Sequence, residues 1–223
     1  MESFDKTWEL VHQNSTWGKY PSEDVVRFMA RNYYSKDRSS IKVLDIGCGG
    51  GANTWYFAIE GFDTYAFDGS PSAVEKTKEL VKAMGLTANV IVCDAANLPY
   101  EDNYFDIVID SGVITANTTQ GINSIISECF RVLKKEGSLF CTGLFNTQTS
   151  GMNTGVKLEE NTYSNLTEGR LAGIGTVHFF TMDELDTIMS NNGFEICSKD
   201  KVTRTDNNRK DTVSYYIITA IKS

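Results

Sequence analysis

Long apolar runs, prolines and basic residues are all scarce in this chain of 223 residues. The uninterrupted apolar stretches are only a few residues long, as from Trp55 to Ile59. Because a membrane-spanning helix needs about 20 such residues, the sequence predicts no membrane span. The first residues, Met1 to Asp5, are acidic and lack the basic and apolar regions of a signal peptide. We therefore expect a cytoplasmic protein.

The basic residues number 21 against 29 acidic ones, which gives a formal net charge of −8. Nucleic-acid binding depends on clustered Lys and Arg side chains that contact phosphates. The densest basic stretches, Lys134-Lys135 and Arg204 to Lys210, are short and stand beside acidic residues. Although a local patch can oppose the net charge, we expect no nucleic-acid partner.

Metal-binding patterns are also missing. The five cysteines lie far apart and form no C-x-x-C pair, and most have apolar neighbours. An odd number of cysteines without ligand spacing argues against a zinc site and a disulfide framework. Buried, reduced thiols explain them better, and the sequence predicts no metal centre.

Helix and strand patterns alternate through the first two thirds of the chain. Short apolar segments predict strands, and amphipathic segments between them predict helices. Ser70-Pro71, for example, offers a helix N-cap followed by proline at the first helical position. Buried strands separated by helices favour a parallel sheet covered on both faces. The predicted strands are 41–46, 62–67, 89–93, 105–109 and 138–142, and the predicted helices are 21–34, 53–60, 71–84 and 122–133.

The last third of the chain is organised differently. Residues 143–180 are rich in Gly, Thr and Asn with weak periodicity, as in a lid or binding loop. A capping box, Thr181 to Glu184, then opens a helix. Two strand-like runs, 194–202 and 213–221, have no helix between them and most simply pair as an antiparallel hairpin. We expect one domain over residues 1–223, with an N-terminal helical segment at about 1–35 and an insert or lid at about 143–180.

The strongest local signal is the run Val43 to Gly51, where glycines directly follow the first predicted strand. Such a turn lets backbone N–H groups approach a ligand without obstruction by Cβ atoms. The glycine spacing also fits a dinucleotide-binding fingerprint, so the loop alone does not distinguish an NAD site from a site for another nucleoside cofactor. Asp45, two residues before Gly47, would repel a pyrophosphate and attract the ammonium and sulfonium charges of S-adenosylmethionine (SAM). The loop therefore favours SAM over NAD.

Further acids stand at the ends of the next strands. Asp68 can accept both ribose hydroxyl groups, a role found in SAM and NAD enzymes alike. Asp94 with Ala95 can meet the adenine amino group, and Asp110 ends the fourth strand. One such acid is often a solvated turn residue, but four along one sheet edge after a glycine turn indicate a nucleoside site.

Over about residues 40–145, the chain resembles the class I SAM-dependent methyltransferases, and the final hairpin extends the similarity to residue 223. The resemblance implies a three-layer α/β sandwich whose mostly parallel, seven-stranded Rossmann-like sheet ends in an antiparallel hairpin. The residues Asp45, Gly47, Gly49 and Gly51 match its first motif, Asp68 its ribose acid and Asp94 its adenine-contacting acid. The chain departs from the family where Ser70 follows Asp68-Gly69, since an apolar residue often packs on adenine there. The expected cofactor-binding residues are Asp45, Gly47, Cys48, Gly49, Gly51, Asp68, Gly69, Asp94, Ala95, Asp110 and Ser111.

The sequence contains fewer signals for the methyl acceptor, because methyl transfer needs mainly alignment and a water-poor site. The chain lacks a Pro-Pro-aromatic motif and a cysteine after proline, which amide, base-amine and C5-cytosine methylases often have. Together with the acidic charge, this points to a small-molecule acceptor methylated at oxygen or nitrogen rather than carbon. His178 is the candidate general base, and the alternative is a structural histidine beside Phe179 and Phe180.

The N-terminal segment carries Trp8, Trp17, Lys19 and Tyr20. It fits a lid over the methionine end of SAM, with Lys19 near the carboxylate, or equally a helix packed by its tryptophans. Two other functions stay open at this point. One is an NAD(P)-dependent oxidoreductase, which shares the glycine loop and Asp68. The other is a protein that binds SAM without catalysis.

Overall fold

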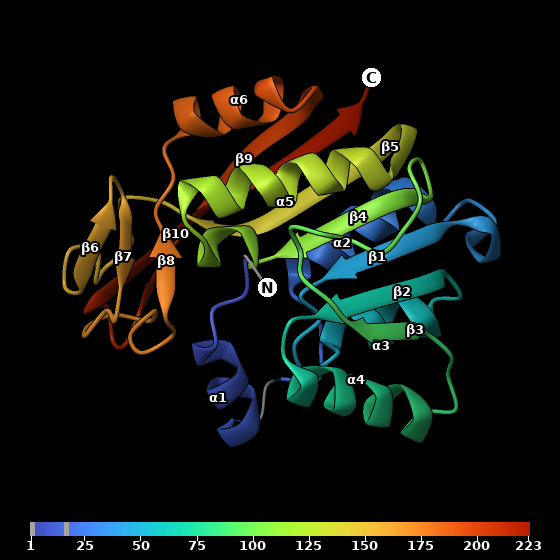
Figure 1. The fold of residues 1–223 in the computed structure, drawn as a ribbon, viewed down its shortest axis with the longest axis horizontal. Coiled ribbons are helices and arrows are strands. Elements are labelled where there is room, and N and C mark those ends of the chain that lie inside the picture. The colour runs from blue at the N-terminus through green and yellow to red at the C-terminus, as the bar shows by residue number, and fades with distance from the viewer. Residues whose placement is uncertain (1–2, 16–17) are drawn as a thin grey trace.

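The computed structural model of the protein describes residues 3–15 and 18–223. Within these residues, a central β-sheet lies between two layers of helices, and a smaller sheet stands at one end (Figure 1). The predicted three-layer α/β sandwich is confirmed.

The central sheet has seven strands among the described residues, in the order β3-β2-β1-β4-β5-β10-β9. Its first five strands are parallel, and β10 runs antiparallel to both β5 and β9. The predicted terminal hairpin is therefore confirmed. The strands are β1 (Lys42–Ile46), β2 (Asp63–Asp68), β3 (Asn89–Val92), β4 (Phe105–Ser111), β5 (Leu133–Phe145), β9 (Phe194–Asp206) and β10 (Asp211–Lys222).

Helices cover both faces of this sheet because its central strands are apolar on both sides. Leu44 and Val108 pack with α5 and α6, whereas Val43 and Ile107 face the opposite layer with α2 and α3. These strand residues are fully buried, which explains their nearly continuous apolar sequence. The helical elements are α1 (Thr7–Asn14), α2 (Glu23–Tyr33), η1 (Arg38–Ser40), α3 (Ala52–Ile59), α4 (Pro71–Ala83), η2 (Ile114–Ala116), α5 (Thr119–Val132) and α6 (Met182–Asn191).

The helix starts follow the local signals in the sequence. The Ser70 hydroxyl accepts a hydrogen bond from Ala73 N, with Pro71 opening α4. Thr181 and Glu184 form the predicted capping box of α6. Both helices thus begin where their capping residues satisfy otherwise unpartnered backbone N–H groups. None of the helices in the described ranges is long and apolar enough to cross a membrane.

The segment after β5, predicted as a lid or binding loop, contains a small antiparallel sheet. Its strands are β6 (Val156–Glu159), β7 (Thr162–Ser164) and β8 (Thr176–His178), in that order. Tyr163, Val177 and Phe179 belong to a separate apolar cluster beneath it. Because these strands have only three or four residues each, they leave little periodicity in the sequence. In Figure 1, this sheet stands beside the ends of β4 and β5, above α1.

Candidate active site

The glycine turn between β1 and α3 has a backbone that only glycine adopts readily. Gly47, Gly49 and Gly51 have φ angles of 62°, 53° and 86°, in the region that L-residues with a Cβ disfavour. A Cβ on Gly47 would also lie 2.1 Å from Cγ2 of Val113. Glycines of this turn therefore line the cavity without side chains. Val113 packs closely against Gly47.

Asp45 connects this turn to the helix that follows it. Its carboxylate is fully buried and accepts hydrogen bonds from Thr54 Oγ1 at 2.6 Å and Asn53 Nδ2 at 3.3 Å. Burial raises the pKa of Asp45 to about 6, against the opposing effect of these hydrogen bonds. Asp45 is placed beside the turn, as expected, but is not part of the cavity lining.

Asp68 ends β2 and faces the cavity. One carboxylate oxygen accepts the N–H of Gly49 at 2.9 Å, and the other accepts the N–H of Ser70 at 2.8 Å. It therefore holds the glycine turn and the start of α4 together. Burial raises the pKa of Asp68, and the two backbone donors oppose this effect.

Asp94 and Asp110, the acids after β3 and at the end of β4, are engaged by backbone. Asp94 accepts hydrogen bonds from Ala96 N at 3.0 Å and from both N and Oγ of Ser3. Asp110 is fully buried, and its Oδ1 accepts Val113 N at 2.8 Å and Ile114 N at 3.2 Å. Burial raises the pKa of Asp110 to about 7. Its carboxylate shapes the turn into η2 and is not part of the cavity lining.

A cavity of about 520 Å³ opens at the carboxyl edge of the sheet. Its floor includes the glycine turn and the ends of β2 and β4. Its roof is formed by the N-terminal segment, by Gly18 and residues 20–22, and by Arg170 of the insert. The structure brings seven of the expected residues to this cavity: Gly47, Cys48, Gly49, Asp68, Gly69, Ala95 and Ser111. It places the other four, Asp45, Gly51, Asp94 and Asp110, behind the lining.

The cavity fits the expected nucleoside cofactor in its volume and in the carboxylate acceptor that it presents. Pockets for small ligands commonly measure about 300–1,000 Å³. An acidic side chain, Asp68, faces this cavity beside glycines that leave the backbone accessible. Among the described lining residues, the arginine or lysine present is Arg170, which belongs to the insert and not to the glycine turn.

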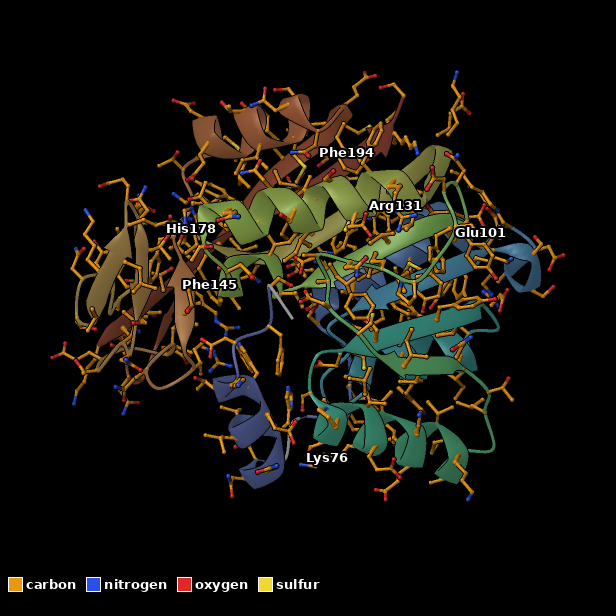
Figure 2. All side chains as sticks on the ribbon, viewed as in Figure 1. Lys76, Glu101, Arg131, Phe145, His178 and Phe194 are labelled. Atoms are coloured by element: carbon orange, nitrogen blue, oxygen red, sulfur yellow. The ribbon has the colours of Figure 1, made fainter. Side chains whose placement is uncertain are left out.

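The N-terminal segment closes the cavity through contacts that sequence reasoning missed. The Glu9 carboxylate binds the hydroxyl groups of Ser70 and Ser72, the latter at 2.6 Å, and these bonds lower the pKa of Glu9 to about 2. Lys76 Nζ binds the carbonyl oxygens of His12 and Ser15 at the end of α1. Figure 2 shows Lys76 on α4 beside α1. Helix α1 is thereby fixed against the start of α4.

The same segment also reaches the insert. The Asp5 carboxylate accepts hydrogen bonds from N and Oγ1 of Thr176, at 3.0 and 3.1 Å. Trp8 and Tyr20 line the cavity, but Lys19 lies against the Trp55 ring, 5.3 Å from its centroid, and is not in the lining. Trp17 lies outside the described residues. The sequence of the N-terminal segment did not indicate these contacts, because the residues that it contacts are distant in the chain.

His178 is not brought into the cavity. Its side chain is fully buried, with Nδ1 2.7 Å from Thr162 Oγ1 and Nε2 3.0 Å from Glu184 Oε1. Its carbonyl oxygen accepts the hydroxyl of Thr115 at 2.9 Å. Figure 2 shows His178 between the small sheet and α5. This placement corresponds to the structural histidine considered above and gives no support to the general-base role.

No group of three or more potential metal ligands occurs in the described part of the chain. His12 lines the cavity, and a Cβ on Gly49 would be 3.4 Å from its Cε1. Burial lowers the pKa of His12, while nearby Asp68 opposes that shift. His12 therefore belongs to the wall beside the glycine turn.

Residues 43–137 match a family model described as a methyltransferase domain. An uncharacterised methyltransferase of Synechocystis is 38% identical over 96 residues, 43% of each chain. A tRNA N(3)-cytidine methyltransferase of Gallus gallus is 28% identical over 73% of this chain and 45% of its own. The mitochondrial ubiquinone biosynthesis O-methyltransferase of Bos taurus is 26% identical over 78% of this chain and 46% of its own. The chain spans less than half the length of these three curated relatives.

Solved structures share the fold. A SAM-dependent methyltransferase of Methanosarcina mazei matches with a TM-score of 0.65 at 24% identity, over 81% of this chain and 92% of its own. The [4+2]-cyclase SpnF matches with a TM-score of 0.70 at 18% identity, over 97% of this chain and 94% of its own. At these identities, the likeness shows a common architecture.

The two buried acids predict a pH-dependent stability. With pKa values of about 6 for Asp45 and about 7 for Asp110, the folded protein holds protons that the unfolded chain releases near pH 4. The free energy of unfolding should therefore fall as pH rises from about 4 to about 7. Asp110→Asn should make this fall in the free energy of unfolding smaller by about 3 kcal/mol, because the amide does not titrate.

Urea unfolding at about pH 5 and about pH 7.5 measures this difference. The free energy of unfolding of Asp110→Asn, relative to that of the wild type, should increase with pH. The control Asp102→Asn changes an exposed carboxylate and should leave the pH dependence of the free energy of unfolding unchanged. An equal pH dependence in Asp110→Asn and the wild type would contradict the prediction.

Truncating His178 should affect stability rather than the cavity. His178→Ala removes the partner of Thr162 Oγ1 and leaves a void, which should lower the free energy of unfolding by about 2–4 kcal/mol. The dissociation constant of S-adenosylhomocysteine should change less than about twofold, corresponding to about 0.4 kcal/mol. Urea unfolding and calorimetric titration measure the two quantities. A variant as stable as the wild type would disprove the structural role.

Proposed function

Because the chain belongs to the class I, Rossmann-like family of SAM-dependent methyltransferases, we propose that it transfers a methyl group from SAM to a small-molecule acceptor, at oxygen or nitrogen. The observation that carries this proposal is the cavity at the carboxyl edge, where Asp68 and the open glycine turn face the same space. SAM, when bound, supplies an electrophilic methyl group on a sulfonium, which a nucleophilic acceptor atom displaces in line.

The residues that would hold the cofactor are kept in place by hydrogen bonds within the protein. Asp68 is fixed by Gly49 N and Ser70 N, so its oxygens are oriented before any ribose arrives. Gly47 and Gly49 leave the turn without side chains, and Ala95 offers its backbone at the next strand end. This preorganisation reduces the entropy lost on binding.

The roof of the cavity supports a small acceptor. The N-terminal segment and the insert are joined by Asp5 and Thr176, so a substrate must fit beneath this bridge or enter beside it. Asn117 and Ser22 add polar groups to the lining, and Arg170 adds a guanidinium group. Enclosure of this kind aligns an acceptor and limits water, which are the main requirements of methyl transfer. The proposal needs no general base from His178.

Calorimetric titration with S-adenosylhomocysteine and with NADH tests the cofactor. We expect saturable binding of S-adenosylhomocysteine and none of NADH, because Asp45 stands beside the turn where a pyrophosphate would lie. Clear binding of NADH alone would replace the proposal with an oxidoreductase.

The acceptor class is tested with SAM carrying a radiolabelled methyl group. The protein is incubated in parallel with a panel of small phenols and amines and with bulk tRNA, because one relative is named a tRNA methyltransferase. Label in the small-molecule fraction supports the proposal, and label in tRNA alone contradicts it. Saturable SAM binding without transfer in either arm would favour a non-catalytic SAM-binding protein.

Removing the Asp68 carboxylate should weaken cofactor binding. Asp68→Ala deletes a charged acceptor in a buried site, and we expect S-adenosylhomocysteine to bind more weakly by about 1.5–3 kcal/mol. Asp63→Ala is the matched control, since Asp63 begins the same strand at the opposite end and should leave affinity unchanged. Calorimetry on both variants decides, and an unchanged affinity in Asp68→Ala would refute the ribose assignment.

A further inference from the structure

We propose that Phe4, in the N-terminal segment, supplies the apolar surface against which the adenine ring of the cofactor packs, in place of the side chain that Gly69 lacks. This inference rests on the cofactor assignment proposed above. It adds a cofactor-contacting residue that lies 65 positions before Gly69 in the chain.

The first observation is that the Phe4 ring fills the space of a side chain at position 69. An ideal Cβ on Gly69 would lie 2.2 Å from Cδ2 and 2.4 Å from Cγ of Phe4. Such distances are much shorter than van der Waals contact, so no side chain at residue 69 can coexist with the ring in this place. The backbone does not require glycine here, because Gly69 is not among the glycines with positive φ. The ring itself therefore accounts for the glycine.

The second observation is the position of the ring within the cavity. Phe4 is only half-buried and lines the cavity together with Asp68, Gly69 and Ala95. Asp68 is the expected ribose acid, and Ala95 stands at the strand end expected to meet adenine. An adenine joined to a ribose at Asp68 must pass over Gly69 to reach Ala95. It then lies beside the Phe4 side chain, whereas Gly69 alone would offer only backbone.

The third observation is that both neighbours of Phe4 are held in place. Ser3 donates from its N–H and its hydroxyl to the Asp94 carboxylate. Asp5 accepts from Thr176 of the insert and from Thr7 N at 2.9 Å. The chain on both sides of Phe4 is thus anchored, by Asp94 after β3 on one side and by Thr176 of β8 on the other. A ring held in this way loses little conformational freedom when the cofactor binds.

Stacking of a base on an aromatic side chain weakens markedly when the aromatic residue is replaced by alanine. We therefore expect Phe4→Ala to bind S-adenosylhomocysteine about 10-fold more weakly than the wild type, and adenosine by a similar factor, because the lost contact is with the shared nucleoside. Leu10→Ala is the matched control. Leu10 is an exposed apolar residue of α1 outside the cavity lining, so its truncation should leave both affinities unchanged.

Returning the apolar surface to residue 69 gives the sharper test. In the double variant Phe4→Ala with Gly69→Val, the valine enters the space that the ring vacates, and affinity should recover most of the loss. Gly69→Val alone should bind more weakly than the wild type, because its side chain and the Phe4 ring then compete for the same space. Thermal unfolding without ligand, run on each variant, verifies that all of them are folded.

The outcomes separate this inference from the proposed function. If the wild type binds S-adenosylhomocysteine and Phe4→Ala binds it equally well, the inference is overturned while the cofactor assignment stands. Tighter binding by Phe4→Ala also overturns it, because the ring would then occupy the place of adenine. If the double variant binds S-adenosylhomocysteine no more tightly than Phe4→Ala, the effect of Phe4 is purely structural, and the inference is likewise overturned. Absence of binding by the wild type removes the cofactor assignment and this inference together.

Discussion

The structure depends on carboxyl groups that are buried at the carboxyl edge of the sheet and accept hydrogen bonds from the turns that follow the strands. Asp68 binds two backbone N–H groups from different turns, and Asp110 binds two in the turn to η2. Asp45 is held by the first turn of α3. Asp110 Oδ2 has no hydrogen-bond partner among the described residues, and burial raises the pKa of Asp110 to about 7, which favours its neutral form. These hydrogen bonds join each turn to its strand end at the floor of the cavity.

The parts of the fold that follow local rules could be predicted from the sequence. The caps at Ser70 and Thr181 and the glycine turn after β1 have short-range signatures, and each lies where the sequence indicated. The direction of a side chain at a strand end has no such signature. Asp68 and Asp110 both end buried strands, yet Asp68 faces the cavity and Asp110 faces its own turn. Only the packing of the loops distinguishes them.

Contacts between distant segments explain what the sequence could not indicate. Ser3 meets Asp94 across 91 positions, and Asp5 meets Thr176 across 171. His178 looked like a candidate base because it stood near a presumed lid, but β8 pairs with β7 and directs its ring onto Thr162. The match to the family model covers residues 43–137, which include the glycine turn and Asp68 but neither the N-terminal segment nor the insert. Two of the relatives reported above are named for different methyl acceptors, cytidine in tRNA for one and ubiquinone biosynthesis for the other.

The position of Ser3 has a practical consequence for work on this protein. Because Ser3 and Phe4 line the cavity, a purification tag fused ahead of the chain is joined only two residues before the cavity lining and competes with ligands for space. The carboxyl terminus lies at the far side of the molecule, beyond α5 and β10 (Figure 1). An affinity tag after Ser223 therefore leaves the opening clear, and an amino-terminal tag needs cleavage before any ligand is titrated.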